Sequence, residues 1–170
     1  FDVRNSANTV VAQLTTNAQG EATTPNLPLG TYTVTETFVP SPYILDTTPK
    51  TVTISYVNQT TPVVTVETTF TNAPAQGRVR VIKKDTSGTL VPGAKFDVRN
   101  SANTVVAQLT TNAQGEATTP NLPLGTYTVT ETFVPSPYIL DTTPKTVTIS
   151  YVNQTTPVVT VETTFTNAPA

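Results

Sequence analysis

The sequence predicts an all-β protein, an antiparallel sandwich of six or seven short strands per domain, with the domains repeated in tandem. Three observations lead to this prediction. Thr and Val, whose branched side chains favour strands, are abundant, whereas helix formers are sparse and scattered. Fifteen Pro residues interrupt the chain at intervals too short for long helices. Apolar and polar residues alternate between turn-like clusters, which is the pattern of half-buried strands.

A repeat sets the domain organisation. Residues 1–75 are identical to residues 96–170, at an offset of 95 positions, and the unique segment 76–95 separates the two copies. We therefore expect 76–170 to be a complete domain and 1–75 to be an incomplete copy that lacks its first strand. Repetition without sequence drift is typical of a stalk or fibre, in which every unit does the same mechanical job.

Strands are expected throughout the complete domain, separated by turn signals. In chain order they are residues 78–84, 95–99, 105–110, 126–134, 145–152 and 158–167, with a shorter strand at 116–119. The segments 85–88 and 112–115 each end in Gly, as tight turns between strands often do.

Alternation along each strand places three polar residues on apolar faces, because successive side chains point to opposite sides of a sheet. Lys83 lies on the apolar face of the first strand, and Lys84 on the opposite face. Glu131 shares the apolar face of the 126–134 strand with Phe133, and Asn167 lies on that of the last strand. A single such residue is usually at a strand end and reaches water. Three together are expected to be paired or chemically altered, because burying an isolated charge costs roughly several kcal/mol.

Composition excludes several classes of function. The chain contains no Cys, Met, Trp or His, so a disulfide framework, a Cys/His metal site and a His-dependent catalytic triad are all excluded. The net charge of -2 provides no basic field for nucleic acid. No apolar run is long enough for insertion into a membrane. We expect no cofactor and no enzymatic turnover.

The complete domain resembles the B-type repeat of collagen adhesins, the Cna B-like domain of Gram-positive bacterial surface proteins and pili. The resemblance covers residues 76–170. It is carried by segments 77–85 (GRVRVIKKD), 92–98 (PGAKFDV), 122–132 (LPLGTYTVTET) and 164–167 (TFTN). One departure is the Pro-Ser-Pro-Tyr sequence at 135–138, where such domains commonly have Pro-x-Gly-Tyr. The resemblance implies a Greek-key sandwich of the immunoglobulin-like or prealbumin-like type, located outside the cell on the bacterial surface.

The resemblance also implies a spontaneous intramolecular isopeptide bond. Carried over to this sequence, Lys83 is the nucleophile, Asn167 the electrophile and Glu131 the proton shuttle. Lys84 is the competitor for the first role, but alternation places it on the opposite face. The bond would form once per domain, so this is not a turnover reaction.

In the partial copy the equivalent residues are Glu36 and Asn72, and the equivalent of Lys83 would precede Phe1. We therefore expect no bond within residues 1–75. An adjacent chain or an upstream segment could complete this copy by adding a strand.

The sequence favours a structural stalk repeat of a bacterial surface adhesin or filament, whose partners are the neighbouring identical repeats of the same chain. The alternative is an adhesin module that binds a host or extracellular-matrix polymer. An exposed aromatic patch would favour that alternative, and Tyr138 and Tyr151 are its candidate residues.

Overall fold

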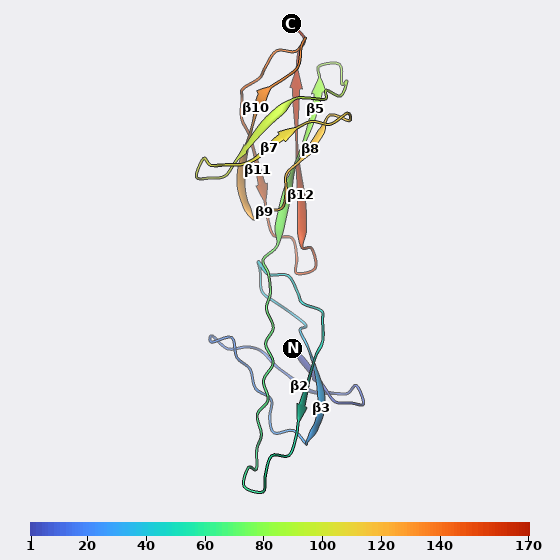
Figure 1. Cartoon of the computed structure of the whole chain (residues 1–170), viewed down its shortest axis with the longest axis vertical. Coiled ribbons are helices and arrows are strands. Elements are labelled where there is room, and N and C mark those ends of the chain that lie inside the picture. The colour runs from blue at the N-terminus through green and yellow to red at the C-terminus, as the bar shows by residue number, and fades with distance from the viewer. The chain divides into compact units, whose positions relative to one another are not determined.

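The computed structural model describes every residue from Phe1 to Ala170, and all of its regular elements are strands (Figure 1). The all-β class predicted from the sequence is confirmed. The structure contains no helix that is long and apolar enough to span a membrane. The chain divides into two compact units, unit 1 at Phe1–Ala73 and unit 2 at Pro74–Ala170.

Unit 2 has eight strands, which follow the predicted ranges closely. They are β5 (Gln76–Asp85), β6 (Lys95–Arg99), β7 (Val105–Thr110), β8 (Glu116–Thr118), β9 (Leu122–Pro123), β10 (Gly125–Phe133), β11 (Lys145–Ile149) and β12 (Val158–Asn167). The two differences of note are β9, which was not predicted, and β11, which ends three residues before the predicted limit at 152.

Two sheets form unit 2. One has the order β11-β10-β6-β7, and the other has the order β12-β5-β8 with β9 also beside β5. All pairs are antiparallel except β5 and β12, the first and last strands, which run parallel and side by side over their whole length (Figure 1). Parallel neighbours require a long crossover connection. Here the connection is residues 86–157, which contain the rest of both sheets.

The core of unit 2 lies between the sheets and is built by alternation. On β5 the side chains of Val79 and Val81 are fully buried, and Val129 of β10 is equally buried. The rings of Phe96 and Phe165 meet at the centre, with 4.9 Å between their centroids. Each sheet therefore buries one face, which is what holds a two-layer sandwich together.

The prediction that Phe133 shares the buried face of Glu131 is wrong. Phe133 is 48% exposed, and the next residue, Val134, is buried instead. The cause is a shift of register between β10 and β6, which falls between Glu131 and Phe133. A bulge of this kind reverses the side-chain alternation for every residue beyond it.

Unit 1 contains one sheet, with β1 (Asp2–Arg4), β2 (Val10–Gln13), β3 (Gly30–Thr35) and β4 (Lys50–Ile54) in the order β2-β1-β3-β4. These strands are the sequence equivalents of β6, β7, β10 and β11, and they take the same order. The stretches of unit 1 that are equivalent to β12, β8 and β9 form no strand. Unit 1 thus has the first sheet of the sandwich without the second.

Candidate functional site

A lysine, a glutamate and an asparagine meet inside unit 2, each from a different strand. Lys83 is on β5, Glu131 on β10 and Asn167 at the end of β12. Their exposed fractions are 0%, 1% and 3%. The structure therefore brings together the three residues singled out by alternation, at the end of the core where β5 and β12 finish.

The Lys83 amine is enclosed by carbonyls and one carboxyl group. Its Nζ donates to the backbone oxygen of Lys84 at 2.9 Å and to that of Phe165 at 3.4 Å. Glu131 Oε1 lies 3.8 Å away. Burial lowers the pKa of Lys83 below its ordinary value of 10.5, because an apolar surrounding disfavours the ammonium form. The nearby carboxyl groups, led by that of Glu131, act in the opposite direction without reversing the shift.

Glu131 lies between the amine and the amide. Its Oε2 accepts a hydrogen bond from Asn167 Nδ2 at 2.9 Å and another from the backbone N–H of Asp141 at 3.1 Å. Its Oε1, on the side of Lys83, has no hydrogen-bond partner. One carboxyl group therefore faces a possible nucleophile with one oxygen and a possible leaving nitrogen with the other.

The orientation of the Asn167 amide is fixed by a backbone group. Nδ2 donates to the carbonyl of Ile139 at 2.7 Å, and a carbonyl can only accept, so the nitrogen must be on that side. Oδ1 is buried without a partner. A buried polar atom without a hydrogen-bond partner costs free energy in the folded state.

The loop after β10 positions this amide, a role that alternation did not reveal. Besides the Ile139 carbonyl and the Asp141 N–H, the loop contributes Tyr138, whose hydroxyl donates to Asp85 Oδ2 at 3.2 Å. The backbone of Tyr138 bridges to Pro169, beyond the end of β12. The Pro-Ser-Pro-Tyr sequence at 135–138 was the one signal of this loop in the sequence, as a departure from the Pro-x-Gly-Tyr of similar domains.

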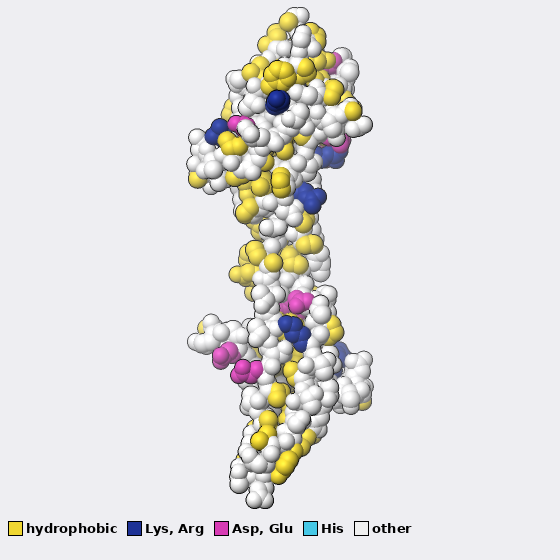
Figure 2. Space-filling view, in the orientation of Figure 1, with side chains coloured by type: hydrophobic (Ala, Val, Ile, Leu, Met, Phe, Trp, Pro, Cys, Tyr) yellow, Lys and Arg dark blue, Asp and Glu magenta, His cyan; other side chains and the backbone are white.

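Lys84, the competitor of Lys83, does not reach the site. It is half-buried on the other face of β5, and the ion pair with Glu131 belongs to Lys83. The two tyrosines named for a ligand-binding surface, Tyr138 and Tyr151, are both half-buried. Figure 2 shows charged side chains of both signs scattered over the visible face of each unit.

Unit 1 contains the acid and the amide in the same arrangement. Asn72 Nδ2 donates to Glu36 Oε2 at 2.7 Å and to the Ile44 carbonyl at 3.0 Å, and Glu36 Oε2 also accepts from the N–H of Asp46 at 2.8 Å. Glu36 is 4% exposed. The single lysine of unit 1, Lys50, lies elsewhere, with its Nζ over the ring of Phe70 at 4.7 Å.

The fold and the buried trio define a class, the prealbumin-like β-sandwich domain. The family model that matches is described as SpaA, a prealbumin-like fold domain, and it matches residues 1–69 and 77–164. The chain belongs to this family. The assignment confirms the resemblance to Cna B-like domains that the sequence motifs predicted.

Solved structures give further likenesses. The Bacillus anthracis TIE protein is 25% identical over 99% of this chain and 30% of its own, with a TM-score of 0.69. BcpA, the major pilin subunit of Bacillus cereus, is 26% identical over 54% of this chain and 28% of its own, with a TM-score of 0.46. The pilus adhesin RrgA from Streptococcus pneumoniae is 33% identical over 45% of this chain and 10% of its own, with a TM-score of 0.41. The chain thus spans less than a third of each. Comparison with curated proteins gives no match.

Proposed function

We propose that unit 2 is a structural stalk domain of a surface protein of a Gram-positive-type bacterium, stabilised by an amide bond between Lys83 and Asn167. The observation that carries the proposal is the buried trio, with Glu131 3.8 Å from the amine of Lys83 and 2.9 Å from the amide nitrogen of Asn167. Membership of the SpaA family of prealbumin-like fold domains and the likeness of the fold to that of the Bacillus anthracis TIE protein support it.

The bond would form by nucleophilic attack. The neutral amine of Lys83 attacks Cγ of Asn167, a new C–N bond forms, the bond from Cγ to Nδ2 breaks, and ammonia leaves. Glu131 takes a proton from the attacking amine and gives one to the leaving nitrogen. Its Oε1 faces the amine of Lys83, and its Oε2 faces Nδ2 of Asn167. The fold replaces an external enzyme by holding the reacting groups together. Each domain reacts once.

The bond would join the first strand to the last. It closes a ring of 84 residue steps, from 83 to 167. Treated like a disulfide, a ring of this size stabilises the fold by about 4–5 kcal/mol. Because β5 and β12 are parallel, a pull on the two ends of the domain loads them in shear, and the bond would carry that load directly.

Intact mass under denaturing conditions tests the proposal. The chain should be lighter than its sequence by one ammonia, and Lys83→Ala or Asn167→Ala should restore the full mass. Lys84→Ala is the matched control, since it removes the neighbouring lysine and should leave the loss of ammonia unchanged. Glu131→Gln keeps the size of the side chain and should remain unreacted. A wild-type chain of full sequence mass would overturn the proposal.

A further inference from the structure

The chain that follows β12 pairs with the loop that follows β10. The N–H of Ile139 donates to the carbonyl of Ala168 at 3.0 Å, and the N–H of Ala170 donates to the carbonyl of Pro137 at 2.8 Å. We call residues 168–170 the tail. Because both bonds join backbone groups, the tail and the loop form a short antiparallel ladder beyond the end of the sandwich.

Tyr138 lies in the middle of this ladder and also ties the loop to β5. Its backbone bridges to Pro169, and its hydroxyl donates to Oδ2 of Asp85 at 3.2 Å. Asp85 is the last residue of β5, two positions after Lys83, so alternation places both side chains on the same face of the strand. A single loop residue thus connects the strand of the amine with the chain beyond the amide.

The loop contacts two of the proposed reacting residues through its backbone. The carbonyl of Ile139 accepts from Nδ2 of Asn167 at 2.7 Å, and the N–H of Asp141 donates to Oε2 of Glu131 at 3.1 Å. Ile139 therefore bonds the tail with its N–H and the amide with its carbonyl. A displacement of the loop would move both groups, and a misplacement of about 1 Å can slow a reaction between positioned groups about 100-fold.

Burial of apolar side chains holds only the start of the loop. Val134 is 9% exposed, whereas Ile139 is 58% exposed and Leu140 is 41% exposed. The part of the loop that carries the Ile139 carbonyl is therefore not fixed by its own side chains. Tyr138 and the tail supply the contacts that fix it.

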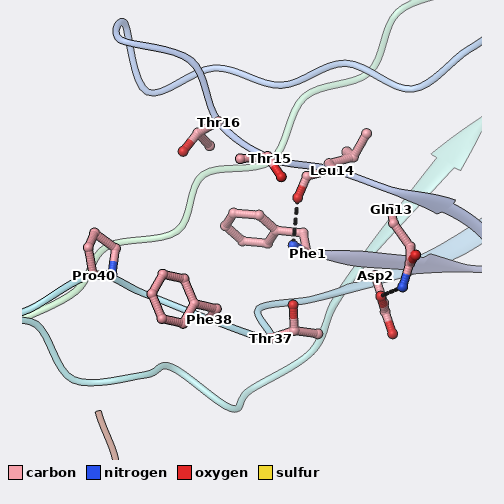
Figure 3. Close-up of a pocket in the computed structure, with 9 residues that line it drawn as sticks. All are labelled: Phe1, Asp2, Gln13, Leu14, Thr15, Thr16, Thr37, Phe38 and Pro40. Atoms are coloured by element: carbon pink, nitrogen blue, oxygen red, sulfur yellow. Dashed lines mark hydrogen bonds between the residues drawn. The ribbon is translucent and has the colours of Figure 1, made fainter. Parts of the chain in front are cut away.

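The backbone contacts of this arrangement recur in unit 1. The N–H of Ile44 donates to the carbonyl of Ala73 at 2.9 Å, and the carbonyl of Ile44 accepts from Nδ2 of Asn72 at 3.0 Å. A cavity of about 410 Å³ reaches the start of the equivalent loop, where Phe38 and Pro40 line it (Figure 3). Neither Ile44 nor Asn72 lines this cavity, so these contacts are separate from it.

We propose that Tyr138 and the tail are positioning elements of the amide-forming site, so that the chain after the last strand is part of the site. They hold the Ile139 carbonyl against the amide of Asn167, and they hold the loop in place relative to β5, which carries Lys83. Neither touches the reacting atoms, and both act through Ile139. Their effect on the rate of amide formation rests on the proposed function, whereas their effect on the position of the amide does not.

The rate is measured on the 170-residue chain made by cell-free synthesis and stopped with a translation inhibitor. Samples are denatured at intervals, and intact mass gives the fraction that has lost one ammonia. Pulse proteolysis of parallel samples gives the folded fraction, which separates slow folding from slow reaction. Per folded molecule, Tyr138→Phe should form the amide at least about tenfold more slowly. Tyr151→Phe makes the same change elsewhere in unit 2 and should react at the rate of the parent chain.

Two further pairs of variants distinguish positioning from a general loss of structure. Asp85→Asn keeps the turn contacts of Oδ1 and offers an Nδ2 that can donate to the Tyr138 hydroxyl, so it should react at the parent rate. Asp85→Ala removes that partner and should be as slow as Tyr138→Phe. Ala170→Pro removes the N–H that bonds Pro137 and should also be slow, whereas Ala170→Gly keeps it and should not. Should Tyr138→Phe give no folded chain, Asp85→Ala and Ala170→Pro take its place.

An unreactive chain shows the position of the amide directly. Lys83→Met keeps the length of the side chain and removes the nucleophile. In this chain, NMR should show slow exchange of the Asn167 carboxamide protons with water. Adding Tyr138→Phe should make that exchange faster, and adding Tyr151→Phe should leave it unchanged.

The outcomes separate this inference from the proposed function. Loss of ammonia in the parent chain, with unchanged rate and exchange in Tyr138→Phe and Ala170→Pro, would overturn the inference and leave the proposed function standing. Equal slowing by Tyr138→Phe and Tyr151→Phe would also overturn it. A change in only one of the two elements would assign the role to that element alone. If the parent chain keeps its full mass, the proposed function fails, and the exchange of the Asn167 protons alone decides whether Tyr138 positions the amide.

Discussion

Lys83 couples the stability of the unreacted domain to pH, because folding isolates its amine from water. Its pKa is lowered in the folded state, whereas the unfolded chain has the ordinary value of 10.5. Between these two values the unfolded state binds more protons, so folding stability rises with pH and levels off above 10.5. Denaturant titration of the Asn167→Ala chain, which cannot react, should show this rise in unit 2. Adding Lys83→Ala should remove that contribution, and a stability that falls with pH across this window would contradict it.

Thr111 is a second residue whose contribution to stability depends on its surroundings. Its hydroxyl is buried and bonds both the Val91 carbonyl and the Ala94 N–H. Thr111→Val keeps the shape and leaves two buried backbone groups without partners, so unit 2 should lose about 1–3 kcal/mol. The identical change at Thr16, which is exposed in unit 1, should stay within about 0.5 kcal/mol. Chemical denaturation of both variants makes the comparison, and equal losses would count against it.

For single residues, the side chains of the candidate site could be predicted from the sequence, whereas the backbone groups that orient them could not. Alternation on β5, β10 and β12 identified Lys83, Glu131 and Asn167, because a polar residue on an apolar face stands out. The carbonyl of Ile139 and the N–H of Asp141 orient the amide and the acid just as directly. A backbone group is the same at every position, so nothing in the residue types pointed to them.

Among the elements, β5 is packed so closely that a single methyl group should disturb it. Gly115→Ala would add positive-φ strain and a contact of 2.7 Å with the Lys83 carbonyl, whereas Gly20→Ala adds only the strain. We expect Gly115→Ala to destabilise its unit by about 1–3 kcal/mol more than Gly20→Ala does. Thermal unfolding of the two variants, each compared with the parent chain, measures the difference. Loss of ammonia in unit 2 should also become slower in Gly115→Ala.

Strand positions could be predicted because turn residues and alternation are local signals. The bulge between Glu131 and Phe133 could not, since it is defined by the register against β6 and not by β10 alone. The parallel pairing of β5 with β12 is likewise a property of two segments that are far apart in sequence. The repeat showed that residues 1–75 correspond to β6–β12 without an equivalent of β5.

For the whole molecule, the position of the proposed bond determines what tension can extend. The 84 residue steps between Lys83 and Asn167 would be shielded, which keeps roughly 280–300 Å of extended chain out of reach. Single-molecule pulling on the full chain should show no extension from this part of unit 2. Lys83→Ala should add a step of about that length, less the folded distance between the two residues. Unit 1 extends in both chains and serves as the internal reference, and an equal step in the parent chain would contradict the shielding.

Because Glu131 contacts both Lys83 and Asn167, a bond between these two residues would have a further consequence. The backbone would then no longer be the only covalent path through the domain, because residues 84–166 would become a side branch closed at both ends. A protease that cuts any exposed loop in this branch would open the ring without separating the two ends of the domain. A surface fibre built of such units would keep its continuity after damage that severs an ordinary chain.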